Sequence, residues 1–233
     1  MNETSSDVTT AAAGGADLAW AEPPLDIDAD AGDERAGALV ADEQIRVMAR
    51  ASRLALRCEP AERHPGPVAG TEILDFRLRC VAHADPECHF RWVRVNLALP
   101  DGAVITDLVP RTEVSEHPVK ITHTYGGGVK LDIAVVPFSP EVTAERATEQ
   151  DVYFPKISTS GIDLGYALWD FTAVGAEPLL VDRPLRLLAS MPAGTEQVPV
   201  RLTLRASVAM RGLLGAIPLI GRQSKTIPLS ARA

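Results

Sequence analysis

The sequence has few cysteines, no long apolar run and no secretory start. Three cysteines, Cys58, Cys80 and Cys88, are an odd number and too few to frame a disulfide-stabilised fold. No stretch reaches the ~18 consecutive apolar residues of a membrane-spanning helix. The N-terminus lacks the basic segment and the apolar stretch of a secretory signal. We therefore expect a reduced, cytoplasmic protein, and the Arg-, Ala-, Val- and Pro-rich usage indicates a GC-rich bacterial genome.

The sequence also lacks any concentration of basic residues. Its formal net charge is -8, but residues 1–43 hold eleven acidic residues and a single basic one, Arg35, so the rest of the chain is close to neutral. A nucleic-acid-binding surface needs lysine and arginine gathered on one face. The charge pattern excludes such a surface and predicts an acidic tail joined to a balanced body.

Residues 1–42 are expected to form this acidic, flexible tail, because they are rich in Ala, Gly, Asp, Ser and Thr and show no sustained hydrophobic period. Three large apolar residues, Trp20, Leu25 and Ile27, nevertheless lie among the acids. Acidic segments with a few large apolar side chains often fold onto a partner. The alternative is that these residues pack back onto their own domain.

The remainder, residues 43–233, is predicted to be one large domain, with two small packed sandwiches as the alternative. Segment 42–51 has the composition of a short helix, and the alternation of Leu54, Leu56 and Cys58 after it leaves an edge strand as the alternative. Alternating hydrophobicity and turn signals then predict about ten short strands. These are 73–82, 88–99, 104–109, 119–125, 129–136, 152–157, 166–171, 185–190, 198–209 and 225–230. With no strand–helix–strand rhythm, the pattern indicates a mainly β protein, an antiparallel β-sandwich with at most one or two short helices.

Two groups of residues have the types that bind metals, but not the required arrangement. Cys80, His83, Cys88 and His89 flank a predicted turn at 84–87, and strand alternation sends them to different faces of that hairpin. Asp26, Asp28 and Asp30 resemble the start of a calcium loop. The sixth and twelfth positions of that loop would be Ala31 and Gly37 instead of Gly and Glu. We expect neither a metal ion nor another cofactor.

No local catalytic constellation is present either. The glycines at 126–128 lie between two predicted strands and indicate a hairpin turn, since no Lys-Ser or Lys-Thr on a helix follows as in a phosphate-binding loop. Segment 158–161 lacks the flanking glycines of a nucleophile elbow. His123 shares the parity of core positions. The sequence therefore predicts a protein that is not an enzyme.

Most of the aromatic residues fall in a short stretch, and we expect them to form the central strands of the core, with a ligand groove as the alternative. They are Tyr153, Phe154, Tyr166, Trp169 and Phe171.

Segment 212–221 is the most unusual, because it joins two predicted strands yet carries no polar side chain. Three interpretations remain open: the segment plugs the core, docks another chain, or enters a membrane with Arg211 and Arg222 at headgroup level. The residues that would make the contact are Leu213, Leu214, Ile217, Leu219 and Ile220.

The leading hypothesis is a non-enzymatic interaction or assembly module, which binds another protein chain or a second copy of itself through segment 212–221 and the acidic tail. The alternative is a membrane-acting, pore-forming or membrane-inserting effector whose apolar tip at 212–221 enters lipid. A third hypothesis is a hydrolase without a recognisable motif, since catalytic residues can be distant in sequence.

Overall fold

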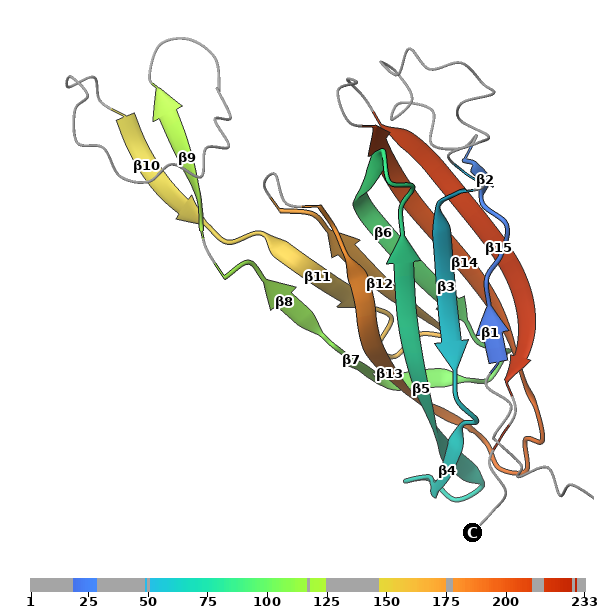
Figure 1. The fold of residues 1–233 in the computed structure, drawn as a ribbon. Helices are drawn as coiled ribbons and strands as arrows, with labels where there is room; N and C mark the ends of the chain where they lie inside the picture. The colour runs from blue at the N-terminus through green and yellow to red at the C-terminus, as the bar shows by residue number, and fades with distance from the viewer. Residues whose placement is uncertain are drawn as a thin grey trace, which may run out of the picture.

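The computed structural model describes residues 19–28, 49, 51–116, 118–124, 147–174, 178–210, 216–227 and 229. Within them the chain forms two antiparallel sheets packed face to face, plus a separate strand pair (Figure 1). This arrangement confirms the predicted antiparallel β-sandwich. The predicted helix at 42–51 falls almost entirely outside the described residues. Among the described residues, no helix has the length and apolar character to cross a membrane.

Sheet A contains the strands of the first layer, and its central pair is β5 with β13, joined over twelve register positions. Its strands, in spatial order, are β1 (Ala19–Ala21), β3 (Arg53–Cys58), β5 (Thr71–His83), β13 (Val181–Pro192) and β7 (Val104–Val109), with β4 (Glu62–Pro65) paired to the start of β5.

Sheet B forms the second layer, and β6 and β14 lie at its centre. Its strands, in spatial order, are β2 (Asp26–Ile27), β15 (Ile217–Ile227), β14 (Val198–Met210), β6 (Cys88–Ala98), β12 (Tyr166–Thr172), β11 (Pro155–Ser160) and β8 (Thr112–Val114).

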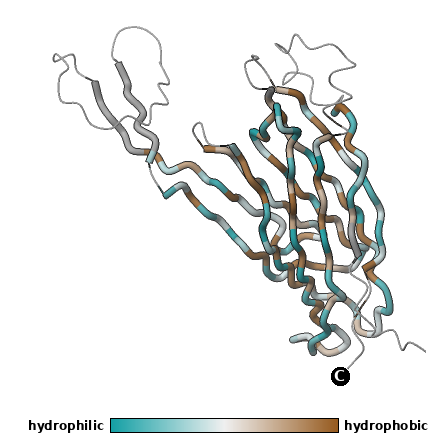
Figure 2. The backbone as a smooth tube through the Cα atoms, viewed as in Figure 1, coloured by the Kyte–Doolittle hydropathy of each residue, from teal (hydrophilic) through white to brown (hydrophobic). Residues whose placement is uncertain are grey.

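The core lies between the two sheets and consists of the residues at alternate positions of the long strands. Figure 2 shows this alternation as brown and teal segments following one another along the strands. Phe76 from sheet A and Phe90 and Trp169 from sheet B are fully buried. Burial of a large apolar side chain contributes roughly 1.5–3 kcal/mol, so these aromatic residues are main determinants of the packing of the two layers.

Residues 19–28 form a segment that we call the N-terminal strap, because it crosses from one sheet to the other. Its first part, β1, pairs with β3 of sheet A, and its second part, β2, pairs with β15 of sheet B. Between them, Pro23 is buried. A Cβ added to Gly221 would lie 2.8 Å from Pro23 Cγ, so the glycine makes room for the strap. This part of the expected tail is therefore bound to the sandwich.

The strands β9 (Val119–Thr124) and β10 (Ala147–Val152) form the separate strand pair, which we call the projecting hairpin. They pair antiparallel with each other, from Val119 opposite Val152 to Thr124 opposite Ala147, and with no strand of either sheet. Figure 1 shows the pair extending away from the sandwich beyond β8 and β11. The predicted strand at 129–136 lies outside the described residues.

Two predicted strands were placed wrongly. The one expected at 152–157 spans the end of β10 and the start of β11. The last strand was expected at 225–230, but β15 begins at Ile217, inside the apolar segment. Strand alternation was absent there because residues 217–221 are buried on both sides. One side faces the core and the other side is covered, in part by Asp28, whose backbone N–H donates to the carbonyl oxygen of Pro218 at 2.9 Å. Strands buried on both faces are continuously apolar.

Candidate functional site

The predicted contact residues of segment 212–221 are divided by the structure. Leu213 and Leu214 lie outside the described residues. Ile217, Leu219 and Ile220 are in β15 and are at most 9% exposed. The described part of the segment is therefore buried, as the core interpretation expects. Contacts of Leu213 and Leu214 with another chain or with lipid remain predictions.

The predicted contact residues of the tail belong to the N-terminal strap. The backbone of Trp20 pairs with Arg57 of β3, and its side chain is outside what the structure describes. Leu25 and Ile27 are half-buried and pack against the core of the sandwich. They thus contact their own domain, and partner binding through them stays a prediction.

The aromatic stretch was expected to be core, and the structure corrects this for three of its members. Trp169 and Phe171 are buried, because they lie on the inner face of β12. Tyr153, Phe154 and Tyr166 are instead 54%, 38% and 42% exposed. Strand alternation places Tyr166 on the face of β12 opposite to Trp169 and Phe171, and Tyr153 and Phe154 follow the end of β10.

Two of the exposed aromatics lie at the base of the projecting hairpin, next to Val114. The carbonyl oxygen of Phe154 accepts a 2.8 Å hydrogen bond from the backbone N–H of Ser115, and Val114 is in register with Pro155. Val114 is itself 54% exposed. We call Val114, Tyr153 and Phe154 the hairpin neck. It is an apolar surface placed where the hairpin leaves the sandwich.

A second exposed apolar surface lies around the turn between β11 and β12. The backbone N–H of Ile105 donates to the carbonyl oxygen of Leu164 at 2.9 Å, which joins this turn to β7. We call this surface the distal patch, and its members are 40–45% exposed: Val104, Ile162, Leu164 and Tyr166. Tyr166 lies at the end of β12 opposite to the end that pairs with β11 at Ile157. The distal patch and the hairpin neck are thus separate surfaces.

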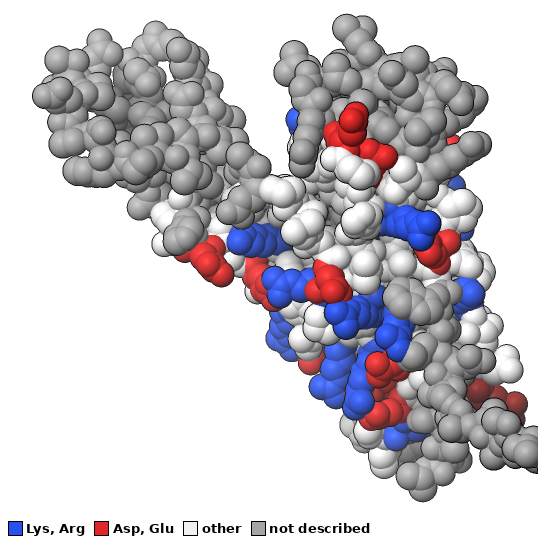
Figure 3. All heavy atoms as spheres, in the orientation of Figure 1, with Lys and Arg blue, Asp and Glu red and all other residues white. Residues whose placement is uncertain are grey.

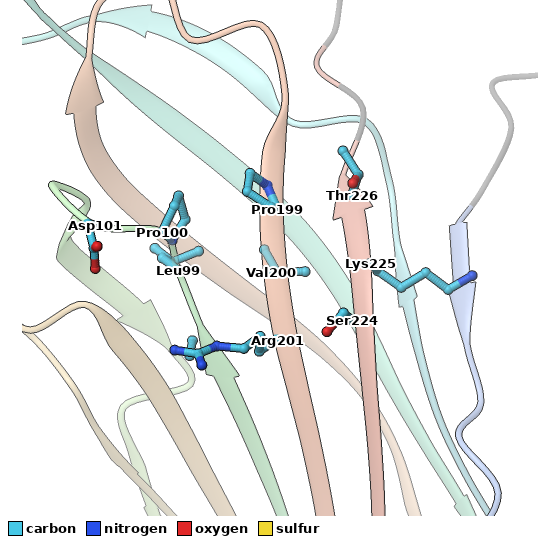
Figure 4. A pocket seen from close by; sticks show the side chains of 10 residues that line it. Leu99, Pro100, Asp101, Pro199, Val200, Arg201, Ser224, Lys225 and Thr226 are labelled. Carbon is cyan, nitrogen blue, oxygen red and sulfur yellow. The ribbon is translucent and has the colours of Figure 1, made fainter.

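An open groove of about 550 Å³ lies beside the turn that follows β6, and its walls come from 98–101, 199–201 and 224–226. It contains two cationic side chains, Arg201 and Lys225. Figure 4 shows Arg201 directed toward the side of Leu99 and Asp101, whereas Lys225 extends to the opposite side, beyond β15. The two charges do not converge on one position, so this groove is a poor site for a single anion.

In the described part of the chain, one group of side chains has the composition of a metal site: Glu62, His64 and Asp75. Both carboxylates are already engaged by arginine. Glu62 binds Arg77 at 3.0 Å, and Asp75 accepts hydrogen bonds from Nε and Nη2 of Arg186 at 2.9 and 2.8 Å. A cation would have to displace two guanidinium groups, which argues against a metal ion here.

The three cysteines have the properties of core residues. All three are buried, and the structure places none of them in a disulfide. Burial raises the pKa of the Cys58 and Cys80 thiols to about 12, and that of Cys88 to about 11. A nucleophilic or metal-binding cysteine needs a lowered pKa, because the thiolate is the reactive form. The geometry offers no thiol chemistry at these three positions.

No protein-family model and no curated protein matches the chain. Similar solved structures include Clostridium perfringens delta-toxin, at 12% identity over 77% of this chain and 81% of the toxin, with a TM-score of 0.34. A pore-forming protein matches at 8% identity over 90% and 89%, with a TM-score of 0.39. A cohesin module from a C. perfringens family 33 glycoside hydrolase matches at 7% identity over 74% and 97%, with a TM-score of 0.35. Likenesses this remote assign no function, and the class that the structure defines is an antiparallel β-sandwich protein.

Proposed function

We propose that this protein acts on membranes, without catalysis, and that the projecting hairpin carries the contact with lipid. The observation behind the proposal is that, among the described strands, β9 and β10 pair only with each other, and that they extend beyond both sheets (Figure 1). An isolated two-stranded hairpin is marginally stable in water. Packing of the hairpin against another surface would therefore supply stabilisation that the sandwich does not provide.

The hairpin neck supports lipid as that surface. Tyrosine is enriched where proteins meet the membrane–water interface, because its ring is apolar and its hydroxyl is polar. Tyr153 and Phe154 are consecutive exposed residues at the neck, and Val114 on the neighbouring strand is exposed as well. Anchoring by these side chains would hold the hairpin at the surface of a bilayer.

The sequence of the first hairpin arm, and of the segment that follows it, also supports the proposal. In 119–122, Val and Ile alternate with Lys and Thr, and the predicted strand at 129–136, outside the described residues, alternates Val, Leu and Ile with Lys130 and Asp132. A strand that crosses a bilayer needs ~9–11 residues and one apolar side. The described arms have six residues each, and a continuation with this alternation would reach the required length.

Entry into lipid would require several copies. The outer edges of β9 and β10 pair with no other described strand. Backbone N–H and C=O groups cannot remain unpaired in hydrocarbon, where each costs several kcal/mol. Hairpins of neighbouring copies would therefore pair edge to edge, which makes a homo-oligomer the assembled form of the protein on the membrane.

The test is binding to, and leakage of, dye-filled vesicles of phosphatidylcholine, which carry no net charge. The variant Tyr153→Ser/Phe154→Ser removes the aromatic rings of the neck. Burying one large apolar side chain is worth roughly 1.5–3 kcal/mol, and 1.4 kcal/mol is tenfold in affinity. We expect the variant to bind vesicles at least about tenfold more weakly and to release correspondingly less dye.

The matched control is Leu164→Ser/Tyr166→Ser, which removes apolar side chains of similar exposure from the distal patch. It should bind and permeabilise vesicles like the unmodified protein. All the substituted residues are well exposed, so the melting temperature should change little. Absence of vesicle binding by the unmodified protein, or equal losses in both variants, would contradict the proposal.

Docking of another protein is the second candidate, and the distal patch favours it. Four apolar side chains gathered on one exposed surface are typical of protein contacts. If this function is the correct one, Leu164→Ser/Tyr166→Ser should abolish partner binding or self-association, while Tyr153→Ser/Phe154→Ser should not.

A further inference from the structure

Four arginine side chains lie together on the solvent-facing side of sheet A. In the strand register, Arg57 of β3 is directly opposite Arg79 of β5, and Arg77 of β5 is directly opposite Arg186 of β13. We call these residues the arginine quartet. Like charges directly opposite on neighbouring strands destabilise a sheet. Two such pairs side by side therefore form a feature that packing alone does not favour.

Carboxylates at the margin of the quartet offset part of this repulsion. Arg77 pairs with Glu62, Arg79 with Asp182 and Arg186 with Asp75, at 3.0, 2.6 and 2.8 Å. Arg79 and Arg186 use Nε and Nη2 for these bonds. Each guanidinium has five N–H donors, and these bonds do not use the donors on Nη1 of either residue.

Three members of the quartet are accessible, and the fourth, Arg57, is half-buried. The side chains of Arg77, Arg79 and Arg186 are 54%, 55% and 51% exposed. All four arginines line one open groove of about 510 Å³, in which Glu59 is the single acidic lining residue. The carboxylates that pair with the quartet do not line this groove. Figure 3 shows Lys and Arg side chains gathered on this face of the molecule.

We propose that the arginine quartet binds a phosphate-bearing ligand. A phosphate group offers several acceptor oxygens and a negative charge, and it matches the planar fork of guanidinium. Neighbouring strands are ~4.8 Å apart, so guanidinium groups from two strands can reach one phosphate or two linked phosphates. This site is independent of the projecting hairpin, and it stands whether or not the hairpin contacts lipid.

The test compares two probes on the full chain. Isothermal titration measures the binding of inorganic pyrophosphate, and flotation measures binding to phosphatidylcholine vesicles with and without phosphatidylglycerol. The variant is Arg57→Gln/Arg79→Gln, which removes one opposed pair. Arg186 is left in place, because its removal would leave Asp75, only 1% exposed, as a buried carboxylate without its partner. The control is Arg201→Gln/Arg222→Gln, the same change of charge on sheet B.

We expect the quartet variant to bind at least about tenfold more weakly, because each hydrogen bond to a charged group contributes enough binding free energy for such a change. The control variant should bind like the unmodified protein. Binding of pyrophosphate would show that a soluble phosphate compound is sufficient as a ligand of the quartet. Binding to phosphatidylglycerol vesicles alone identifies a lipid headgroup. The proposal is overturned if neither probe binds, or if both variants lose binding equally. Because neutral vesicles test the hairpin and pyrophosphate tests the quartet, the two proposals fail separately.

Discussion

At the scale of single residues, the turn between β11 and β12 depends on Gly161. Its φ is 122°, a conformation that L side chains rarely adopt, and an added Cβ would collide with the backbone oxygen of Tyr166. Gly194 has a similar φ of 88°, but a Cβ added there would have no other atom within 4 Å. Comparing substitutions at the two glycines therefore distinguishes the cost of backbone strain from the cost of steric collision.

We expect Gly161→Ala to lower the free energy of unfolding by about 2 kcal/mol or more, because strain and collision add. Gly194→Ala should cost about 1 kcal/mol, from strain alone. Urea unfolding of the two variants measures both values. Equal losses would mean that the turn at Gly161 relaxes without cost.

Buried thiols predict a loss of stability at alkaline pH. The pKa of Cys58 and of Cys80 is raised from 9.0 to about 12, mainly by burial. Below pH 9 both thiols are protonated in the folded and unfolded states. As the pH rises from 9 toward 12, the unfolded thiols lose their protons and the folded ones keep theirs, so the free energy of unfolding falls, by ~1.4 kcal/mol per thiol at about pH 10.

Urea unfolding at about pH 8 and about pH 10 tests this linkage. Other groups also titrate in this range, so the comparison is with Cys58→Ala/Cys80→Ala, whose stability should depend less steeply on pH. The same pH dependence in both proteins would show that these thiols do not contribute.

The exposure of individual side chains outside the regular strands could not be predicted from the sequence. The sequence predicted strands at 88–99 and 198–209, and in β6 and the first part of β14 alternate side chains face the core. Tyr153 and Phe154 gave no such signal: they follow β10, and only the packing of neighbouring chain segments leaves them exposed. The arginine quartet is likewise formed by register, which joins residues distant in sequence.

At the scale of elements, the N-terminal strap shows where composition misleads. Residues 19–28 lie in an acidic region with a low apolar content, which is typical of a flexible tail. Their pairing depends on edges supplied by β3 and β15, which local composition does not reveal. The buried Asp28 also has an ionic partner, Arg205, at 3.2 Å. The acidic residue Asp28, which in the sequence indicated solvent exposure, thus contributes to the packing of the strap.

Deleting residues 1–30 should therefore lower the free energy of unfolding by at least ~2 kcal/mol, because Ala21, Pro23 and Leu25 lose contacts with the sandwich and two strand edges are uncovered. Deleting only residues 1–18 leaves the strap intact and should have little effect. Thermal or urea unfolding of the two truncated proteins distinguishes them. A full-stability 1–30 deletion would show that the strap adds no net stabilisation.

At the scale of the whole molecule, the two proposed contacts differ in their response to salt. The arginine quartet acts through charge, whereas the hairpin neck acts through apolar area. Screening shortens the reach of exposed charges from ~10 Å at 0.1 M salt to ~3 Å at 1 M. Apolar contacts are not weakened in this way.

We expect binding to phosphatidylglycerol-containing vesicles to decrease between about 0.1 and about 1 M salt, and binding to pure phosphatidylcholine vesicles to change little. Arg57→Gln/Arg79→Gln should reduce the salt dependence, and Tyr153→Ser/Phe154→Ser should not. Flotation at several salt concentrations provides the measurement. A salt dependence that is the same for both variants would remove the distinction between the two surfaces.

The strap also sets an order of events during synthesis. Its second half pairs with β15, which lies almost at the other end of the described chain. While the protein emerges from the ribosome, the strap is made before its site at Gly221, which does not exist until β15 has been made. Contacts between such distant segments form slowly. This edge of the sandwich is therefore closed only after β15 has been made, by a segment that was translated long before it.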